Sequence, residues 1–259
     1  MTIRFACTMC GRCCHGLRLP LGMAEAVAWL RDGNDVQLFC EAIPWPSEPP
    51  ADNLPAMHKR RRSFEAMSGP LPVRVIVTLM ASFDGPCPNL RPDMRCGIYE
   101  RRPTTCRIYP AEVNPFIALE PKNKLCPPEA WATGDPIQFD DGRWADAELA
   151  GNIVRSRDTD MAEAVLKQRV CALLGCSTAA LSNEGMVVHS PRQDAILAAL
   201  EAVLDGNAAA ATNDVAWQLV TNRAQTLGAL RDIGSWHATA QSLQGPGMAY
   251  LGYFEADVG

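Results

Sequence analysis

Cysteine is the residue type whose spacing in this chain points most directly to chemistry. The chain has eleven cysteines, and four of them lie in the first fourteen residues as the run Cys7-x2-Cys10-x2-Cys13-Cys14. A two-residue spacing lets a tight turn aim successive thiolates at one centre, and three such thiolates with one distant cysteine are the ligand pattern of a [4Fe–4S] cluster. We expect adjacent Cys13 and Cys14 to point in different directions, which suits two centres or two metals of one cluster.

A second group of cysteines is spread more widely, with gaps of eight, nine and nineteen residues between its members. Its members are Cys87, Cys96, Cys106 and Cys126. Eight thiolates suffice for two cubane clusters, for two zinc sites of four thiolates each, or for one cluster with spare redox-active thiols. Zinc ribbons use compact cysteine pairs, whereas a cubane accepts ligands from distant loops, so this spacing favours iron over zinc.

The remaining candidates have simpler interpretations. Cys40, Cys171 and Cys176 lie in or beside apolar segments, and free cysteine is among the most buried residue types, so we expect them in the core. Arg107 follows Cys106 directly, and an arginine there can offset the charge of a thiolate cluster and hydrogen-bond its sulfur. Neither a Ser/His/Asp set nor paired carboxylates stand at a recognisable spacing, so the sequence does not decide whether the protein is an enzyme.

Composition limits the class of protein. The chain has 259 residues, of which 47% are hydrophobic and 20% charged, as in ordinary globular proteins. A net charge of −5 gives no global electrostatic reason to bind nucleic acid or an anionic membrane. No apolar run approaches the roughly 18 residues that span a bilayer, and the N-terminus lacks the apolar stretch of a secretory signal. We therefore expect a cytoplasmic protein whose cysteines are metal ligands rather than disulfides.

These cysteines must be positioned by helices and strands, and the sequence predicts an α+β protein with two parts. Residues 1–130 form a small, irregular, cysteine-rich metal-binding domain with short strands, and residues 131–259 form a mainly helical region. In the first part we expect strands at 16–21 and 72–82 and a helix at 22–32 that ends at Gly33. Residues 84–128 contain nine prolines, so they can form little regular hydrogen-bonded structure and need metal ligation as another source of order.

The second part shows the periodicity of amphipathic helices. Apolar residues recur at helical spacing over residues 160–174, 190–206 and 214–232. These three predicted helices would pack as a small bundle or cover the first part. A face of this helical region is also the expected binding surface for a protein partner, whose identity the sequence does not reveal.

Two stretches resemble a known family. The run Cys7–Cys14 and the stretch from Cys87 through Cys96-Gly-Ile-Tyr-Glu-Arg-Arg-Pro-Thr-Thr-Cys106-Arg-Ile-Tyr-Pro110 resemble the YkgJ-type cysteine-cluster family, a CxxCxxCC zinc- or iron-chelating domain. The resemblance covers roughly residues 5–128 and does not extend to residues 131–259. The cysteine domain of flagellin lysine N-methylases is similar, and for them an iron–sulfur cluster with S-adenosylmethionine-dependent methyl transfer is implied.

Several functions therefore stay open. The first is a protein with a redox or cluster-dependent role that binds one or two [4Fe–4S] clusters. The second is a structural zinc module that supports a protein-interaction surface, and the third is a metal buffer. The fourth is a protein-lysine methyltransferase that uses S-adenosylmethionine, and it is disfavoured because no Gly-rich nucleotide loop follows a predicted strand.

Overall fold

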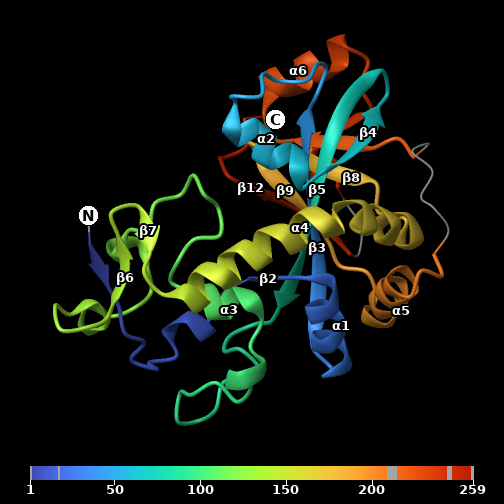
Figure 1. The fold of residues 1–259 in the computed structure, drawn as a ribbon. Helices are drawn as coiled ribbons and strands as arrows, with labels where there is room; N and C mark the ends of the chain where they lie inside the picture. The colour runs from blue at the N-terminus through green and yellow to red at the C-terminus, as the bar shows by residue number, and fades with distance from the viewer. Residues whose placement is uncertain (1, 17, 209–214, 244–246, 258–259) are drawn as a thin grey trace. The chain divides into compact units, whose positions relative to one another are not determined.

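The computed structural model describes residues 2–16, 18–208, 215–243 and 247–257, with helices and strands mixed along the chain, as expected for the α+β class (Figure 1). The chain forms two compact units, each made of two separate segments. Unit 1 contains Met1–Leu21 and Ala81–Thr159, and unit 2 contains Gly22–Met80 and Asp160–Gly259. The boundary near residue 130 follows from composition and stays a prediction. No helix among the described residues is long and apolar enough to cross a bilayer.

Unit 1 is built from short elements. Strands β1 (Ile3–Arg4), β6 (Ile137–Asp140) and β7 (Arg143–Trp144) form an antiparallel sheet, and the unit also contains β2 (Leu19–Leu21). Its helices are η1 (Arg12–Cys14), η2 (Tyr99–Arg101), α3 (Thr104–Ile108), η3 (Pro121–Asn123), η4 (Pro128–Trp131) and the first part of α4 (Ala147–Leu174). As the prolines predict, residues 84–128 contain only short helices, turns, bends and residues in isolated bridges.

Unit 2 is built around a mixed sheet. Its strands are β3 (Asp35–Pro44), β4 (Phe64–Ser68), β5 (Leu71–Ser82), β8 (Thr178–Leu181), β9 (Gly185–His189), β10 (Gln218–Thr221), β11 (His237–Thr239) and β12 (Met248–Gly252). Its helices are α1 (Met23–Arg31), α2 (Leu54–Arg61), α5 (Gln193–Leu204), α6 (Ala224–Asp232) and η5 (Ala240–Ser242), with the rest of α4. The strand order β11-β10-β8-β3-β5 contains parallel pairs from β11 to β3.

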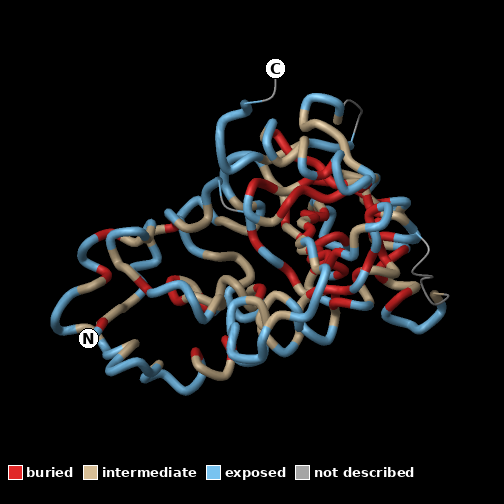
Figure 2. The backbone as a smooth tube through the Cα atoms, turned by 90° about the horizontal axis from the view of Figure 1, so that it is seen from above, coloured by how far each residue is buried: buried red, intermediate tan, exposed pale blue. Residues whose placement is uncertain are grey.

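Burial explains why unit 2 folds as it does. Its buried residues gather in the sheet, where Val75, Ile76 and Leu79 of β5 and Leu38 of β3 are almost fully enclosed (Figure 2). Strands buried on both faces read as continuous apolar runs rather than alternating ones. The run predicted as a strand at 72–82 is confirmed as β5.

The expected helical second half is not confirmed. The stretch predicted as one helix over 214–232 contains strand β10, and α6 begins only at Ala224; residue 214 lies outside the described residues. Leu219 and Val220 are buried in this strand, and a short apolar run cannot be assigned to a helix or a strand by periodicity alone. Helices α4 and α5 do cover much of the other two predicted segments.

Candidate metal centre

The first cysteine run is wrapped tightly by a glycine turn. Gly11 precedes η1 with φ +68°, and Cys14 N donates to Gly11 O at 2.9 Å. A Cβ atom at Gly11 would lie 2.7 Å from Met94 Cε and 3.1 Å from Met94 O. Glycine is required here both by the left-handed backbone and by the close approach of a second loop. The first run is thereby held against the loop that contains Cys96.

The loop that contains Cys87 and Cys96 is attached to the first cysteine run by backbone hydrogen bonds. Cys87 N donates to Cys14 O at 2.6 Å, which joins two cysteines that are 73 positions apart in the sequence. Within the loop, Leu90 and Cys96 form an isolated antiparallel bridge, so the chain returns toward Cys87. Cys14, Cys87 and Cys96 are thus brought together by backbone contacts alone.

Cys106 and Cys126 come from two further segments. Cys106 lies on the short helix α3, and neighbouring Thr105 Oγ1 donates to Pro20 O at 2.8 Å. Leu125 N, beside Cys126, donates to Tyr109 Oη at 2.8 Å. In addition, Ala6 N donates to Ala130 O at 3.0 Å, which ties the start of the first run to the segment that follows Cys126.

The eight sulfurs form one electrostatic group. Burial, the largest cause, and the thiols of Cys87, Cys13 and Cys96 together raise the pKa of Cys106 to about 12. Burial also raises the pKa of Cys126 to about 11, against a hydrogen bond to Tyr109, and its thiol neighbours are Cys13, Cys10 and Cys7. In a metal-free site, nearby thiols therefore oppose the ionisation of Cys14, Cys87, Cys106 and Cys126, whose pKa values are all raised.

Cys13 and Cys14 do not point apart as expected, because their side chains hydrogen-bond to each other. This bond lowers the pKa of Cys13 to about 6, with smaller contributions from Arg102 and His15. The same bond, together with burial and nearby thiols, raises the pKa of Cys14 well above its ordinary value. Two thiolates cannot sit side by side unless a cation compensates them, so this pair requires positive charge when both are ionised.

The donor set fits a soft metal. All eight predicted ligands are sulfurs, which suit zinc or an iron–sulfur cluster and do not suit calcium or magnesium. Among the residues that the structure describes, no three side chains are arranged to hold an ion as they stand. The thiols are gathered but must close further when metal binds, and the cation would replace the protons that Cys14, Cys87, Cys106 and Cys126 retain because their pKa values are raised.

Arg107 and Arg102, which lie near Cys106 in the sequence, make different contacts. Arg107 Nε donates to Arg102 O at 3.1 Å and its Nη2 donates to Glu100 O, so this guanidinium braces the loop before α3. Its predicted contact with a cluster sulfur stays a prediction. Arg102, which the sequence analysis did not select, favours the thiolates of Cys13 and Cys106 electrostatically and stacks 3.8 Å from the centre of the Tyr99 ring. The sequence feature that could have identified Arg102 is the high density of arginines over residues 101–107.

The other three cysteines lie in unit 2. Cys40, Cys171 and Cys176 are all buried, as predicted for core residues. Burial raises the pKa of Cys176 to about 12, with a further contribution from Cys171. An apolar environment keeps such thiols protonated and inert.

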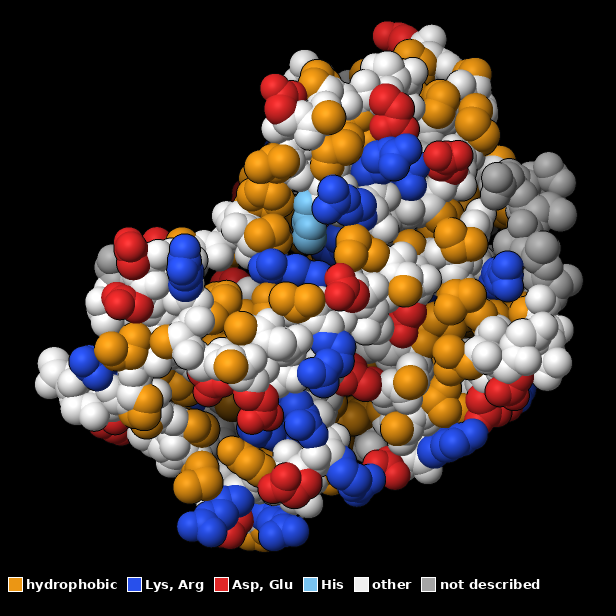
Figure 3. Space-filling model, in the orientation of Figure 1, with side chains coloured by type: hydrophobic (Ala, Val, Ile, Leu, Met, Phe, Trp, Pro, Cys, Tyr) orange, Lys and Arg blue, Asp and Glu red, His pale blue; other side chains and the backbone are white. Residues whose placement is uncertain are grey.

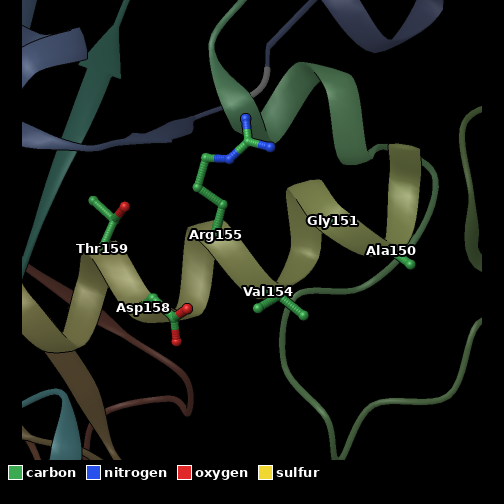
Figure 4. Close-up of a pocket in the computed structure, with 6 residues that line it drawn as sticks. All are labelled: Ala150, Gly151, Val154, Arg155, Asp158 and Thr159. Carbon is green, nitrogen blue, oxygen red and sulfur yellow. The ribbon is translucent and has the colours of Figure 1, made fainter. Parts of the chain in front are cut away.

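An open hollow along α4 is a weaker candidate. It is lined by Ala150, Gly151, Val154, Arg155, Asp158 and Thr159. Figure 4 shows Val154 and Asp158 on one side of the helix and Arg155 pointing to the other. The lining residues include no cysteine or histidine, so this hollow has no part in soft-metal binding.

Comparison with known proteins agrees with the cysteine pattern. Residues 6–127 match the family model described as "CxxCxxCC: Putative zinc- or iron-chelating domain". No curated protein and no solved structure matches the chain. The predicted resemblance is confirmed for this part of the chain.

Proposed function

We propose that the zinc- or iron-chelating domain of residues 6–127 binds iron–sulfur clusters on its eight thiolates, and that the protein has a redox or cluster-dependent role. The observation that supports this proposal is that four distant segments bring eight cysteines into mutual electrostatic contact in unit 1. A structural zinc site needs only four thiolates. We place the protein in the cytoplasm, where such thiols stay reduced.

The contacts favour two neighbouring centres of four thiolates each. Cys14, Cys87, Cys96 and Cys106 interact as one group. Cys7, Cys10, Cys13 and Cys126 interact as the other, and Cys13 also acts on Cys14, Cys87 and Cys106, so it lies between the two groups. The backbone bond from Cys87 to Cys14 and the one from Ala6 to Ala130 support the same division. Cys13 and Cys14 would bring the two centres side by side.

The ligands come from separate segments of the chain, which favours iron over zinc. The group of Cys14, Cys87, Cys96 and Cys106 takes its sulfurs from η1, the loop of residues 87–97 and α3, rather than from two compact pairs. A cubane accepts ligands from separate loops, whereas zinc ribbons use pairs with about two to four residues between their cysteines. Zinc on the same two thiolate groups is the second candidate, because all-thiolate donors suit both metals.

Metal analysis of anaerobically purified protein tests the proposal. Iron, acid-labile sulfide and zinc are measured together with a UV–visible spectrum. Two cubanes predict about eight iron and about eight sulfide per chain with a broad band near ~400 nm. A colourless protein with about two zinc ions per chain would instead establish two zinc sites of four thiolates. Protein without iron or sulfide contradicts the cluster proposal.

Single substitutions test the division into two groups. In Cys126→Ser, two separate centres predict that about half of the iron remains, because only one cubane loses a ligand. Complete loss of iron would show that the sulfurs serve one centre. Cys171→Ser is the matched control, since this cysteine is buried in unit 2 and lies outside both groups; it should keep its full metal content.

A further inference from the structure

Unit 2 places the carboxyl ends of its parallel strands at one edge. Glu41 and Ala42 of β3 pair with Ala180 and Leu181 of β8, and β10 runs parallel beside β8. The loops that follow these strands therefore begin at the same edge of the sheet. In open α/β sheets, ligands bind outside the carboxyl ends of parallel strands. This edge belongs to unit 2, whereas the eight cysteines predicted as metal ligands all belong to unit 1.

A serine is held at this edge between a cation and a carboxylate. Ser182 follows β8 directly, and its backbone N donates to Ala42 O at 2.9 Å, which fixes its position. Lys59 Nζ, from α2, donates to Ser182 Oγ at 2.9 Å. Lys and Arg side chains gather at the surface over α2 (Figure 3). Ser182 itself is half-buried, so its hydroxyl is positioned without being sealed from solvent.

Glu41 supplies the carboxylate. Burial raises the pKa of Glu41, and hydrogen bonding to Ser182 and the charges of Lys59 and Arg62 oppose this effect. The proton acceptor therefore lies next to the serine hydroxyl that Lys59 contacts. A carboxylate whose pKa moves toward neutrality is a better general base than an ordinary one.

We propose that Ser182 is a nucleophile that accepts an acyl group from carboxylic esters. Ser182 Oγ attacks the ester carbonyl carbon while its proton passes to Glu41, and the Lys59 ammonium stabilises the negative charge that develops on Oγ. The tetrahedral adduct expels the alcohol, which takes the proton from Glu41. Water then attacks the acyl-serine and gives a proton to Glu41, which returns it to Oγ as the acid leaves.

A purely structural role predicts different behaviour. A buried carboxylate must be hydrogen-bonded and compensated, and Ser182 and Lys59 meet that need without any chemistry. In that case Ser182 would react no faster than other serines. Ser190 is the matched comparison, because it follows β9 as Ser182 follows β8, is half-buried, and accepts a hydrogen bond from Gln37 Nε2 at 2.8 Å. Both serines belong to unit 2.

The test is covalent labelling of the full holo-protein with a fluorophosphonate, followed by peptide mass spectrometry. In this reaction Oγ forms a bond to phosphorus, fluoride leaves, and the hydroxyl proton passes to Glu41. We expect labelling of Ser182 approaching one per chain, none at Ser190, and at least about a tenfold slower reaction in Glu41→Gln, in line with the usual effect of a general base. Absence of label at Ser182, or equal labelling of Ser190, overturns the proposal.

Ester hydrolysis gives an independent readout. Thiols also attack p-nitrophenyl acetate, so the informative quantity is the difference between Ser182→Ala and Ser190→Ala at equal metal content. The proposal predicts a loss of at least about tenfold in Ser182→Ala alone, within the range expected for a lost nucleophile. Both variants are checked by circular dichroism, and equal rates in two folded variants would contradict a nucleophilic Ser182.

Discussion

The two units of this protein differ in the interactions that stabilise each of them. In unit 2, half of the residues of β3 and most of those of β5 are buried, and residues such as Val36 and Leu79 have no exposed surface. The main apolar cluster of unit 1 contains Ile108, Ala111, Leu149 and Ile153, with Val113 and Trp144 packed against it. We therefore expect hydrophobic burial to suffice for unit 2 and the cysteine loops of unit 1 to need metal ligation as another source of free energy.

Removal of the metal should have the largest effect, and it should be confined to unit 1. Metal binding in all-cysteine sites contributes roughly 10–16 kcal/mol, which rivals the roughly 5–15 kcal/mol that stabilises a whole domain. After anaerobic chelation, we expect rapid hydrogen exchange at the amides of residues 85–128 and slow exchange in β3 and β5. Mass spectrometry of peptic fragments measures both regions in one experiment.

Two results would contradict this division. Equal loss of protection in β5 would mean that unit 2 also depends on the metal. Unchanged protection of residues 85–128 would mean that the loop hydrogen bonds, such as the bond from Cys87 N to Cys14 O, hold unit 1 unaided.

A cavity introduced into the core of unit 2 should destabilise unit 2 and leave the metal content of unit 1 unchanged. Leu79 of β5 has no exposed surface, and Leu→Ala at such a site costs about 2–5 kcal/mol. We expect Leu79→Ala to lower the free energy of unfolding of unit 2, measured in urea, by this amount while the metal content stays unchanged. Leu54→Ala is the control, because this leucine on α2 is 62% exposed and should change little. Loss of metal from folded Leu79→Ala would show that the units are not independent.

The contrast also explains which features could be predicted from sequence. The cysteine motif is local, so its residues and their chemistry could be identified, and α1 with its stop at Gly33 (φ +81°) follows from local signals. The sheet of unit 2 pairs β3 with β8, whose residues are more than 130 positions apart, and no local pattern reveals such pairing. The influence of Arg102 on Cys13 could likewise not be predicted, because it depends on two loops meeting.

A glycine pair tests how closely unit 1 must wrap its thiols. Gly11 and Gly16 both have positive φ, at +68° and +62°, so alanine costs roughly 1–2 kcal/mol of backbone strain at either site. Only at Gly11 would the new Cβ meet another loop, whereas at Gly16 nothing lies within 4 Å. Overpacking adds about 1–3 kcal/mol, so Gly11→Ala should lose metal more readily than Gly16→Ala in a chelator competition. Equal loss would show that the approach of Met94 is unimportant.

The smallest effect should come from a charge network in unit 2, since that unit does not rely on charge. Asp160 contacts Arg62 Nε at 2.6 Å and Lys167 Nζ at 2.9 Å. Burial raises the pKa of Asp160, but Lys167 and Arg62 outweigh it, so the folded pKa lies below the ordinary value. A lowered folded pKa stabilises the protein above the unfolded pKa, about 3.9, and this contribution is lost as the pH falls through the folded pKa.

The free energy of unfolding in urea at pH 6 and at pH 3 measures this contribution. Hydrogen exchange in β8 and β10 is the probe of unfolding. Wild type should lose about 1 kcal/mol more than Asp160→Asn over that interval, a value between those of exposed and buried ion pairs. Asp232→Asn is the control, since Asp232 is exposed at the end of α6 and should behave as wild type. A loss in wild type as large as that of Leu79→Ala would mean that unit 2 depends on its charged groups as much as on its apolar core.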